Sequence, residues 1–186
     1  MVVDTTLGTA TLMSFEDFER LEEGADEIEL LRGELIRMPP PQLPHMEICH
    51  RLFRLLDAAL ERWRKVEPGA KLGKLYIEMG YLLAGNPRSW LRPVVSLTHP
   101  HQTGRRYYEG APLMVFEVVS ENDTARHLEG KVAKYLADGA AEVWVIYPGS
   151  RDAWVYDGLT RAARRETQSI RSELLPGIEI ALDDIL

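Results

Sequence analysis

The sequence predicts an α/β (α+β) fold in which a mixed sheet is flanked by helices. Two nearly continuous apolar runs, residues 113–119 and 142–147, have the length of strands that are buried on both faces. Between them, residues 126–138 have the apolar spacing of a helix that ends at Gly139. Strand, helix and strand in this order indicate a βαβ unit, the expected centre of the fold.

The length and composition predict one folded domain. The chain has 186 residues, of which 45% are hydrophobic, and its formal net charge is -7. A chain of this length buries about two-thirds of its unfolded surface, so it needs no disulfide or metal to form a core. We expect a single domain over residues 1–186, with residues 1–13 as an N-terminal tail and 14–186 as the core. The acidic balance excludes a protein that coats nucleic acid by bulk charge alone.

The single cysteine, Cys49, cannot form an internal disulfide, so we expect a cytoplasmic protein. The first residues lack the basic and apolar stretches of a secretory signal. No segment approaches about 18 uncharged apolar residues, which predicts that the chain does not enter a membrane.

The N-terminal third contains a capped helix, a hairpin and a longer helix. Ser14 and Asp17 stand in the capping arrangement of a helix that is expected to end near Gly24. Two short apolar segments, 27–31 and 34–38, flank Arg32-Gly33, which predicts a hairpin turn. After a proline-rich stretch, residues 45–66 have helical apolar spacing.

The middle and the end of the chain are predicted to be strands. Residues 75–83 alternate with period two, which predicts one half-buried strand, and residues 90–97 are expected to pair with it. Residues 153–156 begin an edge hairpin, and Pro176-Gly177 divides the closing segment.

Glu117 is the most informative residue because it is a carboxylate inside an apolar strand, where an unpaired charge is costly. It lies near the carboxyl end of that strand, where open α/β sheets bind ligands. Lys131 lies near the start of the following helix. The two side chains either hold a divalent cation and a phosphate together or form a structural ion pair, and spacing alone does not decide between these alternatives.

Several ordered blocks resemble the Uma-two family of bacterial putative restriction endonucleases, over roughly residues 14–186. They are residues 28–36 with Met38-Pro39-Pro40, residues 92–96, residues 115–120, Lys131 to Tyr135 with Gly139, Glu142, Trp144 and Pro148, and the ending at 172–177. That family is similar to the PD-(D/E)XK nucleases, so the resemblance implies a restriction-endonuclease-like mixed sheet flanked by helices.

The resemblance also implies a catalytic site. Glu117 corresponds to the metal-binding carboxylate of the second motif, Lys131 to the motif lysine moved onto the helix, and Glu29 to the N-terminal acidic residue. The implied reaction is hydrolysis of DNA phosphodiester bonds by a water activated by Mg²⁺ or Mn²⁺.

One position departs from the family pattern: Pro93-Val94 stands where relatives have Pro-Asp. Valine offers no oxygen to magnesium, so the metal site is expected to be impaired. Three explanations remain open. The site is degenerate, Val94 is an engineered change in an otherwise active enzyme, or another carboxylate replaces the missing one. The candidates for that replacement are Glu78, Glu121 and Asp123.

Weaker candidates lie elsewhere. His45 matches a histidine that relatives often have after the prolines, and it is expected to line a nucleic-acid cleft or to cap its helix. Arg105 and Arg106, next to two tyrosines, are candidates for nucleic-acid contact, although a solvated surface is the commoner role of such residues. The same holds for the basic side chains Arg51, Arg54, Arg62, Arg64 and Lys65. His99 and His101 lack a carboxylate at metal-ligand spacing and are expected to belong to a loop.

Two functions therefore remain from the sequence. The first is a metal-dependent DNA nuclease that is impaired at Val94. The alternative is a catalytically inactive module on the same fold that binds nucleic acid or protein. We expect DNA as a partner and a homodimer as the assembly.

Overall fold

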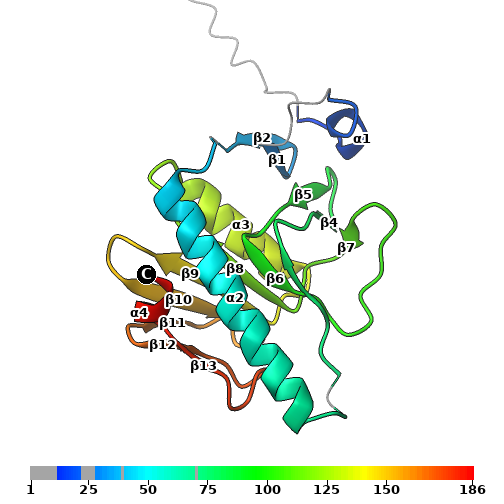
Figure 1. Cartoon of the computed structure of the whole chain (residues 1–186). Coiled ribbons are helices and arrows are strands. Elements are labelled where there is room, and N and C mark those ends of the chain that lie inside the picture. The colour runs from blue at the N-terminus through cyan, green and yellow to red at the C-terminus, as the bar shows by residue number, and fades with distance from the viewer. Residues whose placement is uncertain (1–11, 22–27, 39, 70) are drawn as a thin grey trace, which may run out of the picture.

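A six-stranded mixed sheet lies between two helices, α2 (Leu43–Val66) and α3 (Ala125–Ala137) (Figure 1). The computed structural model describes residues 12–21, 28–38, 40–69 and 71–186. The strand order of this sheet is β11-β10-β9-β8-β6-β3. Its strands are β3 (Leu75–Ile77), β6 (Val95–Leu97), β8 (Met114–Val118), β9 (Glu142–Tyr147), β10 (Asp152–Asp157) and β11 (Ala163–Glu166).

The predicted βαβ unit is present at the centre of this sheet. Strands β8 and β9 are parallel, and α3 connects them. Alternate side chains of β8 face opposite layers: Phe116 and Val118 pack with the residues of α2, whereas Val115 packs with Val132 and Tyr135 of α3. The continuous apolar run of β8 is thus explained by burial on both faces.

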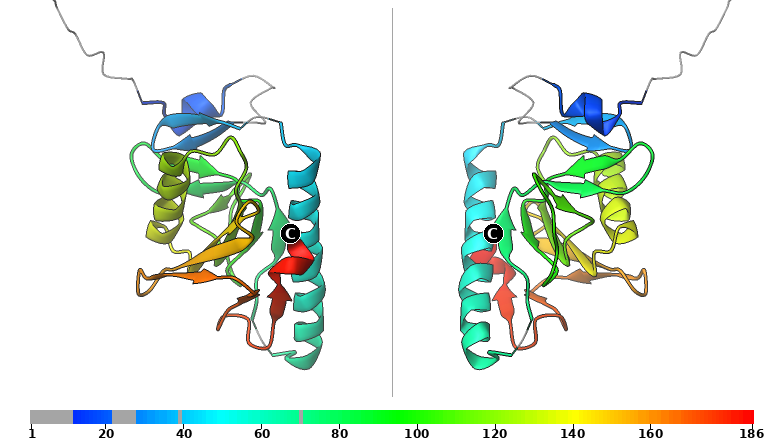
Figure 2. Two further views of the ribbon diagram at one scale, coloured as in Figure 1. Left: turned by 90° about the vertical axis from the view of Figure 1, so that its left-hand side faces the viewer. Right: turned by 90° about the vertical axis from the view of Figure 1, so that its right-hand side faces the viewer.

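A second, five-stranded sheet has the order β2-β1-β5-β4-β7. Its strands are β1 (Ile28–Leu31), β2 (Glu34–Arg37), β4 (Tyr81–Leu83), β5 (Ser89–Leu91) and β7 (Tyr108–Glu109). The predicted hairpin turn joins β1 to β2, and both its central residues have left-handed backbones, with φ of 52° at Arg32 and 83° at Gly33. This hairpin lies above the main sheet, beside the start of α3 (Figures 1 and 2).

The single strand predicted for residues 75–83 is wrong, because the chain changes sheets within it. β3 belongs to the six-stranded sheet and β4 to the five-stranded one. Glu78, between them, has a φ of 53°, which ends the extended conformation. The partner segment is divided in the same way into β5 and β6, around Pro93. The predicted pairing itself is confirmed, since β4 pairs with β5 and β3 pairs with β6.

The first two helices differ in length from the prediction. The Oγ atom of Ser14 caps α1 (Phe15–Phe18) by accepting a hydrogen bond from the Asp17 amide at 3.1 Å. α1 ends at Phe18 and a turn follows it, so the predicted end near Gly24 is wrong. Most of the expected tail lies outside the described residues. α2 begins two residues before the predicted start, with Pro44 in its first turn, where a proline has no backbone bond to lose.

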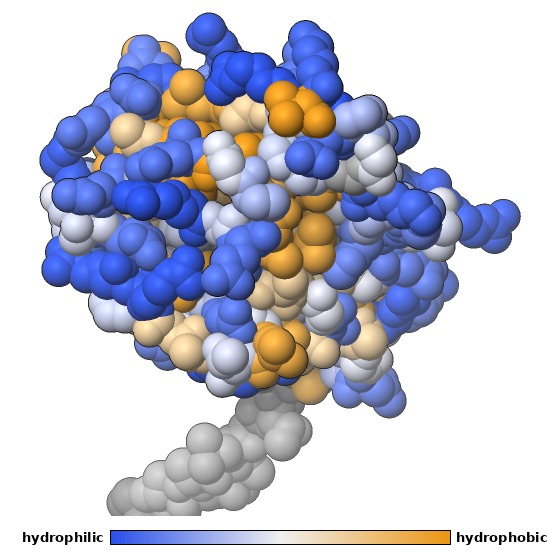
Figure 3. All heavy atoms as spheres, turned by 90° about the horizontal axis from the view of Figure 1, so that it is seen from below, coloured by the Kyte–Doolittle hydropathy of each residue, from blue (hydrophilic) through white to orange (hydrophobic). Residues whose placement is uncertain are grey.

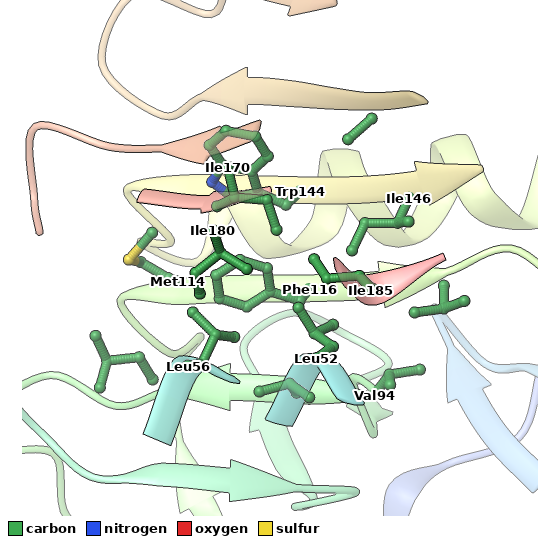
Figure 4. Packing of buried hydrophobic residues seen from close by; sticks show 14 of the residues in the cluster. Leu52, Leu56, Val94, Met114, Phe116, Trp144, Ile146, Ile170, Ile180 and Ile185 are labelled. Atoms are coloured by element: carbon green, nitrogen blue, oxygen red, sulfur yellow. The ribbon is translucent and has the colours of Figure 1, made fainter. Parts of the chain in front are cut away.

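The C-terminal segment closes the core against α2. It consists of β12 (Ser169–Arg171), β13 (Glu179–Ala181) and α4 (Leu182–Ile185). Figure 4 shows its residues Ile170, Ile180 and Ile185 in one apolar cluster with Leu52 and Leu56 of α2 and Phe116 of β8.

Seen from below, hydrophilic residues cover most of the molecular face (Figure 3). No helix in the described part of the chain has the length and apolarity to cross a membrane.

Candidate active site

Three charged side chains from three different elements meet in the interior. Nζ of Lys131 on α3 lies 2.8 Å from Oε1 of Glu117 on β8 and 3.0 Å from Oε2 of Glu29 on β1. The residues are buried, with exposed fractions of 6% for Lys131, 5% for Glu117 and 1% for Glu29. The structure therefore brings together the three side chains that the resemblance implies as catalytic.

Local structure explains why these side chains converge. Strand alternation turns Glu117 toward the α3 layer, opposite to Phe116. Thr124 starts α3 by accepting a hydrogen bond from the His127 amide, which places Lys131 in the second turn. A Cβ atom on Gly130 would lie 2.9 Å from Cδ2 of Leu31, so the glycine permits close packing of α3 against β1. Glu29 is brought near Lys131 by this approach.

Further hydrogen bonds fix the two carboxylates. The hydroxyl group of Tyr135 donates to Oε1 of Glu117 at 3.2 Å, and the backbone amide of Arg92 donates to Oε1 of Glu29 at 2.6 Å. Neither Tyr135 nor Arg92 is a site residue that the sequence predicts. Tyr135 follows Lys131 by four residues, so the two share one face of α3, and that spacing was the available signal.

Burial and charge shift the pKa values of this cluster. Burial raises the pKa of Glu117 to about 7, although the charge of Lys131 acts in the opposite direction. Burial alone lowers the pKa of Lys131, but the charges of Glu117 and Glu29 outweigh it and raise this pKa above its ordinary value. The raised pKa keeps Lys131 positively charged near neutral pH.

The cluster forms the floor of a cavity of about 470 Å³. Proline, methionine and aliphatic side chains form much of its wall. His45, in the first turn of α2, and Asp123, just before α3, also line it. Asp123 and His45 thus line the same cavity as the cluster, but Oδ2 of Asp123 already accepts two hydrogen bonds from Ser120, at 2.7 and 2.9 Å. Burial lowers the pKa of His45, against the opposing charge of Asp123.

Val94 lies between β5 and β6, directly before β6. It lines the same cavity and is 7% exposed. Its side chain belongs to the apolar cluster that contains Leu52 and Phe116 (Figure 4). The amide of Glu78 donates to the carbonyl oxygen of Val94 at 3.2 Å, and Glu78 also lines the cavity. The carboxylate of Glu78 lies 3.7 Å from Nε of Arg92. Burial raises the pKa of Glu78.

The other basic candidates lie away from this cavity. Arg105 and Arg106 belong to the loop before β7, and neither is among the residues that line the cavity. Arg106 pairs with Glu19 at 3.4 Å and lies over the ring of Tyr107 at 5.5 Å. The basic side chains of α2, and His99 and His101, also do not line it.

The comparisons with known proteins agree with this fold. The sequence model of the Uma2 family, described as a putative restriction endonuclease, matches residues 15–183. The chain belongs to this family. The fold of the Uma2 chain is similar to the crystal structure of a putative nuclease belonging to DUF820 from Anabaena variabilis, with 15% sequence identity and a TM-score of 0.73. The match covers 93% of this chain and 97% of that chain. The comparison with curated proteins gives no match.

Restriction-endonuclease-like families generally use divalent metals, so the donor set of this Uma2 chain can be tested against that requirement. Both buried carboxylates already contact the ammonium group of Lys131, and Val94 supplies only carbon. Within the described residues, no group of three or more His, Cys, Asp or Glu side chains is placed to hold a metal ion. The residues as arranged do not fit a divalent cation.

Proposed function

We propose that this chain is a non-cleaving member of its nuclease family, which binds DNA without hydrolysing it. The most direct support is that this site differs in two ways from the metal site that the resemblance implies. An isopropyl group stands at the motif position, and the ammonium group of Lys131 contacts both remaining carboxylates. A hard divalent cation needs several oxygen ligands, and this arrangement offers too few.

The rival function is a metal-dependent DNA nuclease that acts through Glu117, Lys131 and Glu29. One observation favours it: Glu78 lies beside Val94 in the neighbouring segment and lines the same cavity, so it is the nearest replacement carboxylate. However, Glu78 adds only one carboxylate, and a hard divalent cation needs several oxygen ligands. We therefore place this function second.

The DNA contact is proposed at the loop that carries Arg105 and Arg106. Arg106 has a side chain that is 72% exposed, so its guanidinium group can meet a phosphate. The cavity itself is lined by more acidic than basic side chains, which disfavours direct entry of a phosphate backbone without a cation. We also propose a homodimer in the cytoplasm, and the mass of the assembly is measurable by light scattering.

Cleavage and binding assays test this function together. Purified wild-type protein is incubated with supercoiled plasmid and an excess of Mg²⁺ or Mn²⁺, beside Val94→Asp and the double variant Val94→Asp/Lys131→Ala. We expect no nicking by the wild type, nicking by Val94→Asp and none by the double variant. Fluorescence anisotropy on duplex DNA should show binding by the wild type that weakens in Arg105→Ala/Arg106→Ala. Metal-dependent nicking by the wild type that is lost in Glu78→Gln supports the rival function.

A further inference from the structure

The cavity above Glu117 combines apolar walls with an excess of negative charge. Met38, Pro44, Val119 and Leu128 are among its apolar residues. Among the described residues that line it, five carry carboxylates and two carry permanent positive charges. The carboxylates are those of Glu29, Glu78, Glu117, Glu121 and Asp123, and the bases are Arg92 and Lys131. A concave site of this volume and polarity has the character of a small-molecule site.

The charge at the floor is only partly compensated. One ammonium group, that of Lys131, serves two carboxylates. Oε2 of Glu29 lies 3.0 Å from this nitrogen and has no other donor among the described residues. A single cation thus faces two buried carboxylates beside the cavity.

Glu78 adds a charge that is open to the cavity. Its side chain is 50% exposed, and its separation of 3.7 Å from Nε of Arg92 is longer than a charge-assisted hydrogen bond. Its φ of 53° is a conformation in which glycine or asparagine is favoured and glutamate is costly. A carboxylate held at a strained backbone position beside a cavity is typical of a group that contacts a ligand.

We infer that the cavity binds a small organic cation, an amine or a guanidinium group carried on an apolar body, with Glu78 as the residue that contacts its charge. Phosphates are disfavoured by the excess of carboxylates, and a bare divalent ion lacks a sufficient set of oxygens. An alkylammonium ion needs fewer donors, and its apolar part gains from burial against the proline and methionine walls.

This inference goes beyond the proposed function, and different experimental results would contradict the two. Nicking of plasmid by the wild type would contradict the non-cleaving function and leave the amine site standing. Absence of amine binding would contradict the cavity assignment and leave the non-cleaving function standing.

The test uses benzylamine as the probe, with benzyl alcohol, benzoate and methylamine as matched comparisons, in calorimetric titrations of the full chain at neutral pH. We expect benzylamine to bind at least about tenfold more tightly than the other three, because only it combines a positive charge with an apolar ring. Glu78→Gln should weaken benzylamine binding at least about fivefold at an unchanged melting temperature. The exposed Glu61→Gln on α2, which does not line the cavity, is the control and should bind like the wild type.

Three outcomes would overturn the inference. Equal binding of benzyl alcohol would show that charge is not recognised, and equal binding of methylamine would show that the walls contribute nothing. Unchanged benzylamine binding in a folded Glu78→Gln would show that this carboxylate is not the contact. A folded variant is recognised by its far-ultraviolet circular dichroism and its melting temperature.

Discussion

The backbone amide of Glu78 donates a hydrogen bond to the carbonyl oxygen of Val94, at 3.2 Å. This bond joins Val94, at the position where the resemblance implies a carboxylate, to Glu78, which carries one. The two side chains differ in environment, since Val94 packs in the core and Glu78 is half-exposed beside Arg92. Their backbones are therefore neighbours, while only one of them offers oxygen to the cavity.

Val94→Asp should restore affinity for a divalent cation. Without metal, we expect a loss of at least about 2 kcal/mol in the free energy of unfolding, because a charge enters a largely apolar site. Calorimetric titration with Mn²⁺ should then detect binding in this variant and none in the wild type, and Mn²⁺ should raise its melting temperature. Val94→Asn is the matched control, with the same shape and no charge. Comparable Mn²⁺ binding by the wild type and Val94→Asp would contradict the degenerate site.

Lys131→Met should be strongly destabilising, because it leaves Glu29 and Glu117 buried together without their shared cation. Removal of one partner of a buried ion pair costs about 3–5 kcal/mol. Urea denaturation of the wild type, Lys131→Met, Glu117→Gln and the double variant measures the coupling. The double variant should lose less than the sum of the single losses. The exposed Lys65→Met on α2 serves as the control, and additive losses would show that the pair does not interact energetically.

Stability should fall as pH rises through the titration of Glu117. Burial raises its pKa from 4.5 to about 7, so the folded chain holds this proton more tightly than the unfolded chain does. The stabilising contribution is full below about pH 4.5 and is lost as pH rises through about 7, by up to about 3 kcal/mol. The difference in unfolding free energy between the wild type and Glu117→Gln, measured from pH 4.5 to 8, should change accordingly. A constant difference would show that the carboxyl pKa is not raised.

The local parts of the fold were predictable from sequence, and the junctions between sheets were not. The run at β8, the helical spacing of α3 and the Arg32-Gly33 turn each depend on neighbouring residues, and all three are present in the structure. The change of sheet at Glu78 had no such signal, because the period-two pattern continues through it. Left-handed φ values at residues other than glycine are set by tertiary structure.

The candidate site was likewise predictable where it depends on neighbouring residues and not where it depends on packing between sheets. Glu117 and Lys131 belong to one βαβ unit, so their sequence positions already place them near each other. The arrival of Glu29 depends on the packing of the second sheet against α3, through contacts such as that of Gly130 with Leu31. The resemblance to the family supplied Glu29, whereas the hydrogen bonds of Tyr135 and Arg92 became visible only in the structure.

Glu78→Gly separates stability from ligand binding at the strained position. Glycine adopts a φ near 53° without the steric cost that glutamate has there, so the variant should be more stable than the wild type by up to about 1 kcal/mol. It also removes the carboxylate that lines the cavity, so benzylamine binding should be lost. Chemical denaturation and calorimetry on the same preparations measure both effects. A less stable variant would indicate that the contact between Glu78 and Arg92 outweighs the backbone strain, and that this glutamate is retained for the fold.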